Sequence, residues 1–305
     1  ITYRYGGGVG NNVRGNSIRS IQSANIDLDE TSLNAGLAAT TKNSIAINNP
    51  TPAAGGRSAE SIVEVKNNAL AYFQAQQRAV TKDDYITRVY ALPPKFGNVA
   101  KAYVVQDSQL DSKSGANADA RIANPLALNM YLLGFDANKK LVTVNQAVKE
   151  NVQTYLTQFR MVTDAVNIKN AFVINIGVKF NLLTKVGYNK EEVVLRAIQR
   201  VRDFFNIDKW QIGQPIVLAD LAYQISLVNG VSAVVPPEED NPNGHSVLIT
   251  NKFKVSGGYS GNAYDIASAT KDGVVYPSLD PSCFELKYPN VDIEGRVVGN
   301  SSGGN

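Results

Sequence analysis

The clearest pattern along the chain is the alternation of apolar and polar residues over AFVINIGVKFNLL, residues 171–183. The apolar positions are Phe172, Ile174, Ile176, Val178, Phe180 and Leu182. The positions between them include Asn175, Gly177, Lys179 and Asn181. Because the side chains of a strand point alternately to its two faces, this segment predicts a strand with one face on a core.

Helical spacing of apolar residues first becomes clear after residue 57. Ser58 is expected to be the N-cap of a helix, with Glu60 in its first turn. One side of this helix would carry Ile62, Val65, Ala69, Tyr72, Phe73 and Gln76. The pattern predicts an amphipathic helix that packs this side on another surface.

Three further N-caps mark the starts of later helices: Thr81, Asn145 and Asn189. Glu192 gives the last of these a capping-box-like start. The helix after Asn145 has a predicted buried stripe of Val148, Val152, Tyr155, Leu156 and Phe159. The helix after Asn189 would bury Val194, Ala197, Ile198, Val201 and Phe205. Another helix is predicted over residues 218–228.

Strands are expected over residues 98–106, 125–134 and 231–235, so that strands alternate with helices. In the second of them, alternate residues point to one face: Leu126, Leu128, Met130 and Leu132. This order predicts an α+β fold with open sheets covered by helices, arranged as two α/β units. The predicted parts are a β-rich, Gly/Asn-rich extended arm (1–57), the two units (58–162 and 163–236) and a β-rich C-terminal segment with a flexible end (237–305).

The glycine run YGGGVGNN, residues 5–12, raises the question of a phosphate-binding loop. Such a loop needs glycines at fixed spacing after a strand and before a helix. The position of the third glycine is Asn11, and no Gly-Lys-Ser or Gly-Lys-Thr follows. Residues 13–29 also lack an apolar face at helical spacing. We therefore expect no phosphate site here.

The overall composition excludes several classes of protein. With 305 residues, 44% of them hydrophobic, the chain can bury a substantial core. Its 30 basic and 27 acidic residues give a net charge of +3 without a basic stripe, so neither nucleic acid nor a membrane is an expected partner. No apolar run has the length of a membrane span. The start at Ile1, in an apparent strand, suggests the C-terminal part of a longer protein.

Few residues of the chain are suited to catalysis or metal binding. With a single histidine, His245, and a single cysteine, Cys283, a Cys/His zinc site and an internal disulfide are excluded. His245 lies in an Asn/Pro/Gly loop without a nucleophile elbow, which favours an ordinary loop histidine. The run 238–240 is acidic, but its consecutive carboxylates lack the spacing of a calcium loop. The sequence predicts no enzyme, no metal and no cofactor.

Two groups of residues are candidates for an interface with another subunit. Arg196 and Arg200 lie four residues apart on the polar side of one helix and either meet an acidic partner or form a solvated face. The aromatic residues of the Gly-rich C-terminal segment are either buried by a docking partner or packed on the chain's own core. They are Tyr259, Tyr264, Tyr276 and Tyr288.

Several blocks of sequence, taken in order, resemble the baseplate-J-like proteins of contractile phage tails. The first three are YRYGGGVGNNVRGNSI, NNPTPAAGGRSAESIVEVKNNALAYFQAQQRAVTKDDY and GNVAKAYVV. Their matching residues are Arg4, Gly6 to Gly8, Gly10, Asn11, Asn49, Pro50, Gly55, Gly56, Ala59 to Ser61, Arg78 to Thr81, Asp84 and Tyr85. IGQPIVLADLAYQISLVNGVSAVV resembles the end of the family's second α/β unit, so the likeness spans residues 3–235.

Two parts of the sequence qualify this resemblance. The chain has an extra residue, Asn12, before Val13, which we expect to affect only the length of a loop. The ending FELKYPNVDIEG is less diagnostic and is most similar to the larger wedge proteins of T-even-type phages. Under this resemblance, the glycines of the arm would let it turn tightly and lie close against neighbouring chains.

The resemblance implies a structural subunit of the baseplate wedge that associates with its own copies, as a dimer and in a ring around the central hub. Its other expected partners are wedge proteins and the sheath-initiator protein, in a virion tail baseplate assembled in the host cytoplasm. Rearrangement of a baseplate requires interfaces that rotate around intact cores, and residues 107–124 and 236–244 are the expected joints. Two alternatives remain: a carbohydrate-binding or adhesin-like virion module, and a hydrolase with paired carboxylates.

Overall fold

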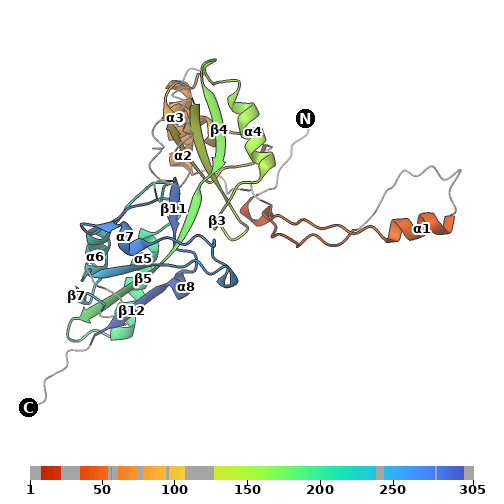
Figure 1. Cartoon of the computed structure of the whole chain (residues 1–305). Coiled ribbons are helices and arrows are strands. Elements are labelled where there is room, and N and C mark those ends of the chain that lie inside the picture. The colour runs from red at the N-terminus through yellow and green to blue at the C-terminus, as the bar shows by residue number, and fades with distance from the viewer. Residues whose placement is uncertain are drawn as a thin grey trace, which may run out of the picture.

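The structure is a computed structural model that describes residues 8–21, 35–53, 56, 61–74, 78–93, 96–106, 127–237, 244–278 and 280–298. Two open sheets, each covered by helices, form the body of the chain, and an arm projects from this body (Figure 1). This arrangement confirms the predicted α+β class. Within the described ranges, no helix is long and apolar enough to cross a membrane.

The first sheet is built around strand β2. Its elements and the helices that cover it are α3 (Lys82–Tyr90), β1 (Lys101–Gln106), β2 (Ala127–Phe135), β3 (Leu141–Val142), α4 (Gln146–Leu156) and β4 (Ala165–Asn170). β1 and β3 pair with β2 in antiparallel fashion, and β4 pairs with it in parallel. α3 and α4 share one apolar core with Met130 and Leu132 of β2.

The helix starts predicted at Thr81 and Asn145 are confirmed. The Thr81 hydroxyl accepts a hydrogen bond from the Asp84 amide (3.2 Å), and the Asp84 carboxylate accepts one from the Thr81 amide (2.8 Å). This reciprocal pair is a capping box. Asn145 Oδ1 accepts a hydrogen bond from the Val148 amide (2.9 Å). Both caps satisfy amides that have no partner inside the helix.

The second sheet is built around the long strand β5. Its elements are β5 (Phe172–Thr184), α5 (Lys190–Phe204), α6 (Leu218–Ser226), β7 (Val231–Val235), β8 (Val247–Asn251), β11 (Ser282–Glu285) and β12 (Ile293–Val297). β7 and β8 pair antiparallel with one edge of β5, and β11 and β12 pair parallel with the other. α5 and α6 contribute buried residues to its core: Val193, Ala197, Val201, Leu218, Leu221 and Ile225.

The predicted start and buried side of α5 need two corrections. Asn189 Oδ1 accepts a hydrogen bond from the Glu191 amide (3.0 Å), and no capping box with Glu192 forms among the described contacts. Val193 is fully buried, whereas Val194 is only partly buried. The sequence spacing allowed either valine because both lie near the boundary of the apolar side.

Smaller elements complete the C-terminal part of the fold. They are β6 (Ile216–Val217), η4 (Val255–Gly257), α7 (Ile266–Ala269), β9 (Thr270–Lys271), β10 (Val274–Val275) and α8 (Pro289–Asp292). β10 pairs with both β6 and β9. Strand pairing also crosses the predicted unit limits, because β8, β11 and β12 lie after residue 236 and complete the sheet of β5. The limits themselves remain a prediction.

β2 lies between the two cores and contributes side chains to both. Met130 and Leu132 face α3 and α4, whereas Leu133 and Phe135 belong to the core of the second sheet. Only Ala171 separates β4 from β5, so one extended segment runs from the first sheet into the second (Figure 1). Full burial of an apolar side chain of this size contributes about 1.5–3 kcal/mol. The two sheets therefore share side chains from one strand and are joined without a flexible linker at this point.

β5 confirms the predicted strand but not the prediction that only one of its faces lies on a core. Ile174, Ile176, Val178, Phe180 and Leu182 are buried as predicted. On the other face, Asn175 is also buried because residues of the C-terminal segment cover it: its Oδ1 accepts a hydrogen bond from the Ser260 amide (2.7 Å). Phe172, predicted to face the core, is 47% exposed at the start of the strand.

The N-terminal region also differs from its prediction. The described part of residues 8–53 contains no strand; it contains the short 3₁₀ turn η1 (Val9–Asn11) and the helix α1 (Ala35–Asn43). α1 was not predicted because its sequence, AGLAATTKN, has a single large apolar residue and no amphipathic pattern. Helix α2 (Ile62–Gln74) begins later than predicted, and the predicted cap at Ser58 lies outside the described residues. Ser61 and Glu64 form its capping box, with hydrogen bonds of 2.7 and 3.3 Å.

Candidate interaction surfaces

The arm is a ribbon of two chain segments that lie side by side. The Asn16 amide donates a hydrogen bond to the Asn49 carbonyl (2.6 Å), and the Ala53 amide donates one to the Val13 carbonyl (2.8 Å). Gly15 is required here, because a Cβ atom at this position would lie 2.9 Å from the Pro50 carbonyl oxygen. The ribbon therefore has a defined register, and it carries α1 at its far end (Figure 1).

Asn12 attaches this ribbon to the body. Its side chain is buried and donates hydrogen bonds to the carbonyls of Phe135 (2.7 Å) and Gly56 (2.9 Å). Its Oδ1 accepts a hydrogen bond from the Gly56 amide (2.7 Å). The expectation that Asn12 affects only the length of a loop is therefore wrong. Its position as an extra residue beside the glycine run was the available signal, but sequence spacing does not show which carbonyls it reaches.

The far part of the arm exposes apolar side chains. Leu37, in α1, is 65% exposed, and Ile18, Ile45 and Ile47 are also exposed. In Figure 1, α1 stands apart from both sheets. At the base of the arm, a Cβ atom added to Gly8 or Gly10 would have no atom of the described chain within 4 Å. Close packing inside the chain therefore does not explain these two glycines, and the proposed contact with neighbouring chains stays a prediction.

α2 presents an apolar side to solvent. Phe73 is 81% and Ile62 is 76% exposed, and Val63, Val65 and Leu70 are exposed as well. The helix also contacts α3. The predicted amphipathic helix is thus present, but within the described chain its apolar side is not covered. The predicted positions Tyr72 and Gln76 lie outside the side chains that the structure describes.

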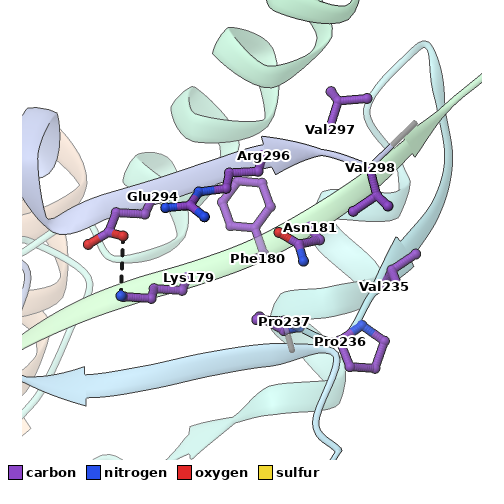
Figure 2. A pocket seen from close by; sticks show the side chains of 10 residues that line it. All are labelled: Lys179, Phe180, Asn181, Val235, Pro236, Pro237, Glu294, Arg296, Val297 and Val298. Atoms are coloured by element: carbon purple, nitrogen blue, oxygen red, sulfur yellow. Dashed lines mark ion pairs between the residues drawn. The ribbon is translucent and has the colours of Figure 1, made fainter. Parts of the chain in front are cut away.

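A cavity of about 290 Å³ lies over the ends of β5, β7 and β12 (Figure 2). The parallel pairing of β5 with β12 places Lys179 beside Glu294 and Asn181 beside Arg296. Apolar residues form the rest of the lining: Phe180, Val235, Pro236, Pro237, Val297 and Val298. Glu294 Oε2 lies 3.3 Å from Lys179 Nζ, and Glu294 Oε1 lies 3.9 Å from Lys252 Nζ.

The cavity contains a charged pair among apolar side chains. Glu294 forms ion pairs with two lysines, and the lining contains no histidine, cysteine, serine or threonine. Exposed ion pairs contribute roughly 0–1 kcal/mol to stability, so this pair mainly orients the side chains. The lining therefore combines charged side chains of β5 and β12 with apolar groups.

The four tyrosines of the C-terminal segment have different environments. The Tyr259 hydroxyl donates a hydrogen bond to Asp292 Oδ1 (2.6 Å), and burial together with this carboxylate raises the pKa of Tyr259. The Tyr264 hydroxyl donates one to the Tyr276 carbonyl (2.7 Å). Tyr276 and Tyr288 are exposed, although the Tyr288 ring also meets that of Tyr259 edge to face. Tyr276 and Tyr288 thus have surface available to a partner, whereas Tyr259 and Tyr264 also serve the chain's own packing.

The two candidate arginines lie on the exposed side of α5. Arg196 forms an ion pair with Glu192, one helical turn earlier. Arg200 is exposed on the same side. An exposed pair of this spacing contributes about 0.3–0.5 kcal/mol, so both side chains remain compatible with a solvated face and with an acidic partner.

The residues considered for chemistry are dispersed. His245 is half-buried at the edge of a second cavity of about 270 Å³, next to β8. Cys283 is buried in β11, on the opposite edge of β5, and burial raises the pKa of its thiol to about 12. Residues 238–240 lie outside the described residues. Among the described residues, no group of three or more His, Cys, Asp or Glu side chains is placed to hold a metal ion.

A buried polar contact joins the two sheets near β3. Glu285 Oε1 accepts a hydrogen bond from the Leu141 amide (2.8 Å), and its Oε2 accepts one from Asn175 Nδ2 (2.8 Å). Burial raises the pKa of the Glu285 carboxyl, and the hydrogen bond from Leu141 offsets part of this rise. Because Asn175 also binds Ser260, this contact connects the first sheet, the second sheet and the C-terminal segment. Sequence analysis missed it, since the three residues are far apart in the chain.

Comparison with known proteins finds remote structural likenesses. No protein-family model and no curated protein matches the chain. The chain is similar to one in the cryo-EM structure of the anti-feeding prophage (AFP) baseplate, 6-fold symmetrised, with 14% sequence identity and a TM-score of 0.44. The match covers 79% of this chain and 46% of that chain, so this chain spans less than half of its neighbour's length. A likeness this remote carries no argument about function.

Proposed function

We propose that this chain is a structural, non-enzymatic subunit of the baseplate wedge of a contractile phage tail. The ordered sequence blocks that resemble baseplate-J-like proteins support this proposal, as does the C-terminal segment that is similar to the large wedge protein of T-even-type phages. The observation that carries it is the arm, whose ribbon holds the exposed residues Leu37, Ile45 and Ile47 away from the body. Apolar side chains on such a projection are typical of a contact with another molecule.

The proposed partners are copies of the same chain, arranged as a dimer and in a ring around the central hub, together with other wedge proteins and the sheath initiator. The apolar side of α2 gives a second surface for such contacts. We propose Arg196, Arg200 and the exposed tyrosines Tyr276 and Tyr288 as further interface residues. In this function the chain would act in the virion, at the tail baseplate.

The chain would also take part in the rearrangement that triggers sheath contraction. Because β2 contributes to both cores and Glu285 connects the two sheets, we expect the body to move as a unit. Motion would then take place at the arm and at the outer surfaces. The joint expected at residues 107–124 and most of the one at 236–244 lie outside the described residues, so their role remains a proposal.

The dispersed positions of His245 and Cys283 support a structural role. They lie beside opposite edges of β5, and the thiol of Cys283 is buried and protonated at neutral pH. A nucleophile and its base must lie within hydrogen-bond reach of each other. The pair therefore does not form a nucleophilic site.

The proposed function can be tested by quantitative mass spectrometry of intact, purified virions from the source of the chain. The measurement is the copy number of this chain relative to the tail sheath protein. A defined number in the six-fold series of a contractile tail is expected. Absence from the virion, or a few stray copies, would contradict the proposal, and a glycan array would then test the carbohydrate-binding alternative.

A further inference from the structure

The cavity over the ends of β5, β7 and β12 has its polar side chains arranged in two rows (Figure 2). Strand register places Asn181 of β5 directly between Val235 of β7 and Arg296 of β12. The same register places Lys179 beside Glu294 in the neighbouring row. Because side chains two residues apart on a strand share a face, both rows lie on the same face of the sheet.

Glu294 is the only acidic residue among the lining residues that the structure describes, and two lysines already hold it. Its Oε2 lies 3.3 Å from Lys179 Nζ and its Oε1 lies 3.9 Å from Lys252 Nζ. Gly177 leaves room for the second lysine, because a Cβ atom there would lie 2.5 Å from Lys252 Cε. Both oxygens of Glu294 thus face ammonium groups, and positive charge exceeds negative charge around the cavity.

The other row ends in donors that have no partner in the described part of the chain. The guanidinium of Arg296 is exposed and the amide of Asn181 is half-buried. Neither group forms a hydrogen bond or an ion pair with a residue that the structure describes. A guanidinium presents its N–H groups in a planar fork that matches the two oxygens of a carboxylate, and the asparagine NH₂ adds a further donor.

The size of the cavity and its apolar walls narrow the class of ligand. Its volume of about 290 Å³ is at the lower end of the range for small-molecule sites, which suits a side chain with its neighbours rather than a large cofactor. Val235, Pro236 and Val297 form apolar walls next to the free donors. One guanidinium and one amide can satisfy the two oxygens of a carboxylate, whereas a phosphate has more oxygens and more charge to satisfy.

We propose that this cavity binds a carboxylate-bearing segment of a partner protein. Arg296 and Asn181 hold the carboxylate of an Asp or Glu side chain, and Val235 and Val297 contact the apolar residues beside it. Charge complementarity selects this occupant, since the excess charge of the cavity is positive and its unpaired groups are all donors. The site goes beyond the proposed function and uses none of the interface residues proposed there.

The test measures the binding of short peptides to the full chain by fluorescence anisotropy. The probes are end-blocked pentapeptides with a central Glu between apolar residues, and a matched set with a central Gln. The Glu peptides are expected to bind, and the Gln peptides to bind roughly tenfold more weakly or less, because they lose a charge-assisted hydrogen bond. Binding that is equal for both sets, or absent for both up to millimolar concentration, would overturn the proposal.

Site variants locate the binding. Arg296→Gln and Asn181→Ala should each weaken the Glu peptides, the first by roughly tenfold or more. Arg200→Gln is the matched control, because it removes the same charge from an exposed position on α5 and should leave binding unchanged. Circular dichroism verifies the fold of each variant. An equal loss in Arg200→Gln would show that overall charge, and not this cavity, attracts the peptide.

Two competitors for the same donors are tested separately. Inorganic phosphate should displace the Glu peptides poorly, and displacement at equal concentration would make the cavity a site for small anions instead. The acidic run 238–240 follows Pro237 directly in the sequence. A variant with these three residues changed to Gln, Gln and Asn should bind the Glu peptides as the unmodified chain does. Binding that appears only in this variant would identify the chain's own carboxylates as the occupant and overturn the proposal.

Discussion

Helices α4 and α2 have similar sequence patterns and opposite environments. Each follows a polar N-cap, Asn145 or Ser61, and each carries apolar residues at helical spacing. α4 buries Val152 completely in the core of the first sheet, whereas α2 exposes 81% of Phe73. The comparison shows that helical periodicity identifies an apolar side that is expected to be buried against another surface. It does not show whether the surface that buries this side belongs to the same chain.

The reason lies in what each helix can reach. α4 is followed by β4, which pairs directly with β2, so the chain itself carries the helix back to the sheet. α2 is preceded by the arm and packs on α3. α3, rather than α2, contributes the buried residues to the core of the first sheet. The strongest tests of this comparison are matched substitutions in the two helices.

The largest effect is expected from Leu156→Ala in α4. Leu156 is fully buried, so its truncation should lower the free energy of unfolding by about 2–5 kcal/mol. The matched change Leu70→Ala in α2 should alter it by about 0.5 kcal/mol or less, because that side chain is exposed. Urea denaturation of both variants measures the difference. Equal losses would show that the apolar side of α2 is covered within the chain after all.

The next effect is expected at the contact between the sheets. Glu285→Gln would place an amide NH₂ against either the Leu141 amide or Asn175 Nδ2, both of which are donors. The loss of a buried hydrogen bond should cost about 1–3 kcal/mol. Asn175→Asp supplies an acceptor, and its second oxygen can still accept from Ser260. In a double-mutant cycle the pair should therefore be more stable than the sum of the single changes; simple additivity would contradict this geometry.

The pH dependence of the free energy of unfolding provides a second test of the Glu285 contact. Burial raises the pKa of folded Glu285 above its ordinary value of 4.5. The stabilising contribution of the protonated form is therefore fully present below pH 4.5 and is lost as the pH rises through the folded pKa. The stability difference between the unmodified chain and Glu285→Gln should accordingly shrink with rising pH over this range. Denaturation curves at a series of pH values measure it, and an increase would show that the ionised form is the better bound.

A smaller, local effect is expected from Asn12→Ala at the base of the arm. This change removes the hydrogen bonds to Phe135 and Gly56 without altering either core. Hydrogen exchange at the Asn16 and Ala53 amides should accelerate about fivefold, for a loss of about 1 kcal/mol, while the global midpoint stays unchanged. Asn48→Ala, which removes one exposed contact to Asn16, is the matched control. Equal acceleration in both variants would show that Asn12 is not the anchor.

The smallest effect is expected on the surface of α5. Arg196→Ala removes an exposed ion pair with Glu192 and should cost about 0.3–0.5 kcal/mol at low salt. This loss should disappear in high salt, because screening already weakens the pair in the unmodified chain. Thermal denaturation at two salt concentrations measures it. A larger, salt-independent loss would indicate that Arg196 has a packing role inside the chain.

Much of the regular structure was predictable from local signals. The caps at Thr81 and Asn145 and the long strand around Ile176 depend on neighbours within four residues or on strict alternation. The arm was harder, because α1 has no amphipathic pattern and Asn12 acts through a carbonyl more than 100 residues away. Of the four tyrosines predicted as interface candidates, Tyr276 and Tyr288 are exposed and their role stays a prediction, whereas the sequence did not indicate that the apolar side of α2 is exposed.

The sequence by itself determined the starts of α3 and α4 with their caps, the long strand β5 and that the fold is of the α+β class. These features follow from periodicity and from hydrogen bonds between near neighbours. Only the tertiary structure decided that β2 serves two cores, that Glu285 binds Leu141 and Asn175, and that α2 keeps its apolar side exposed. Each of these depends on which distant segments meet, and a local pattern of residues carries no information about distance in space.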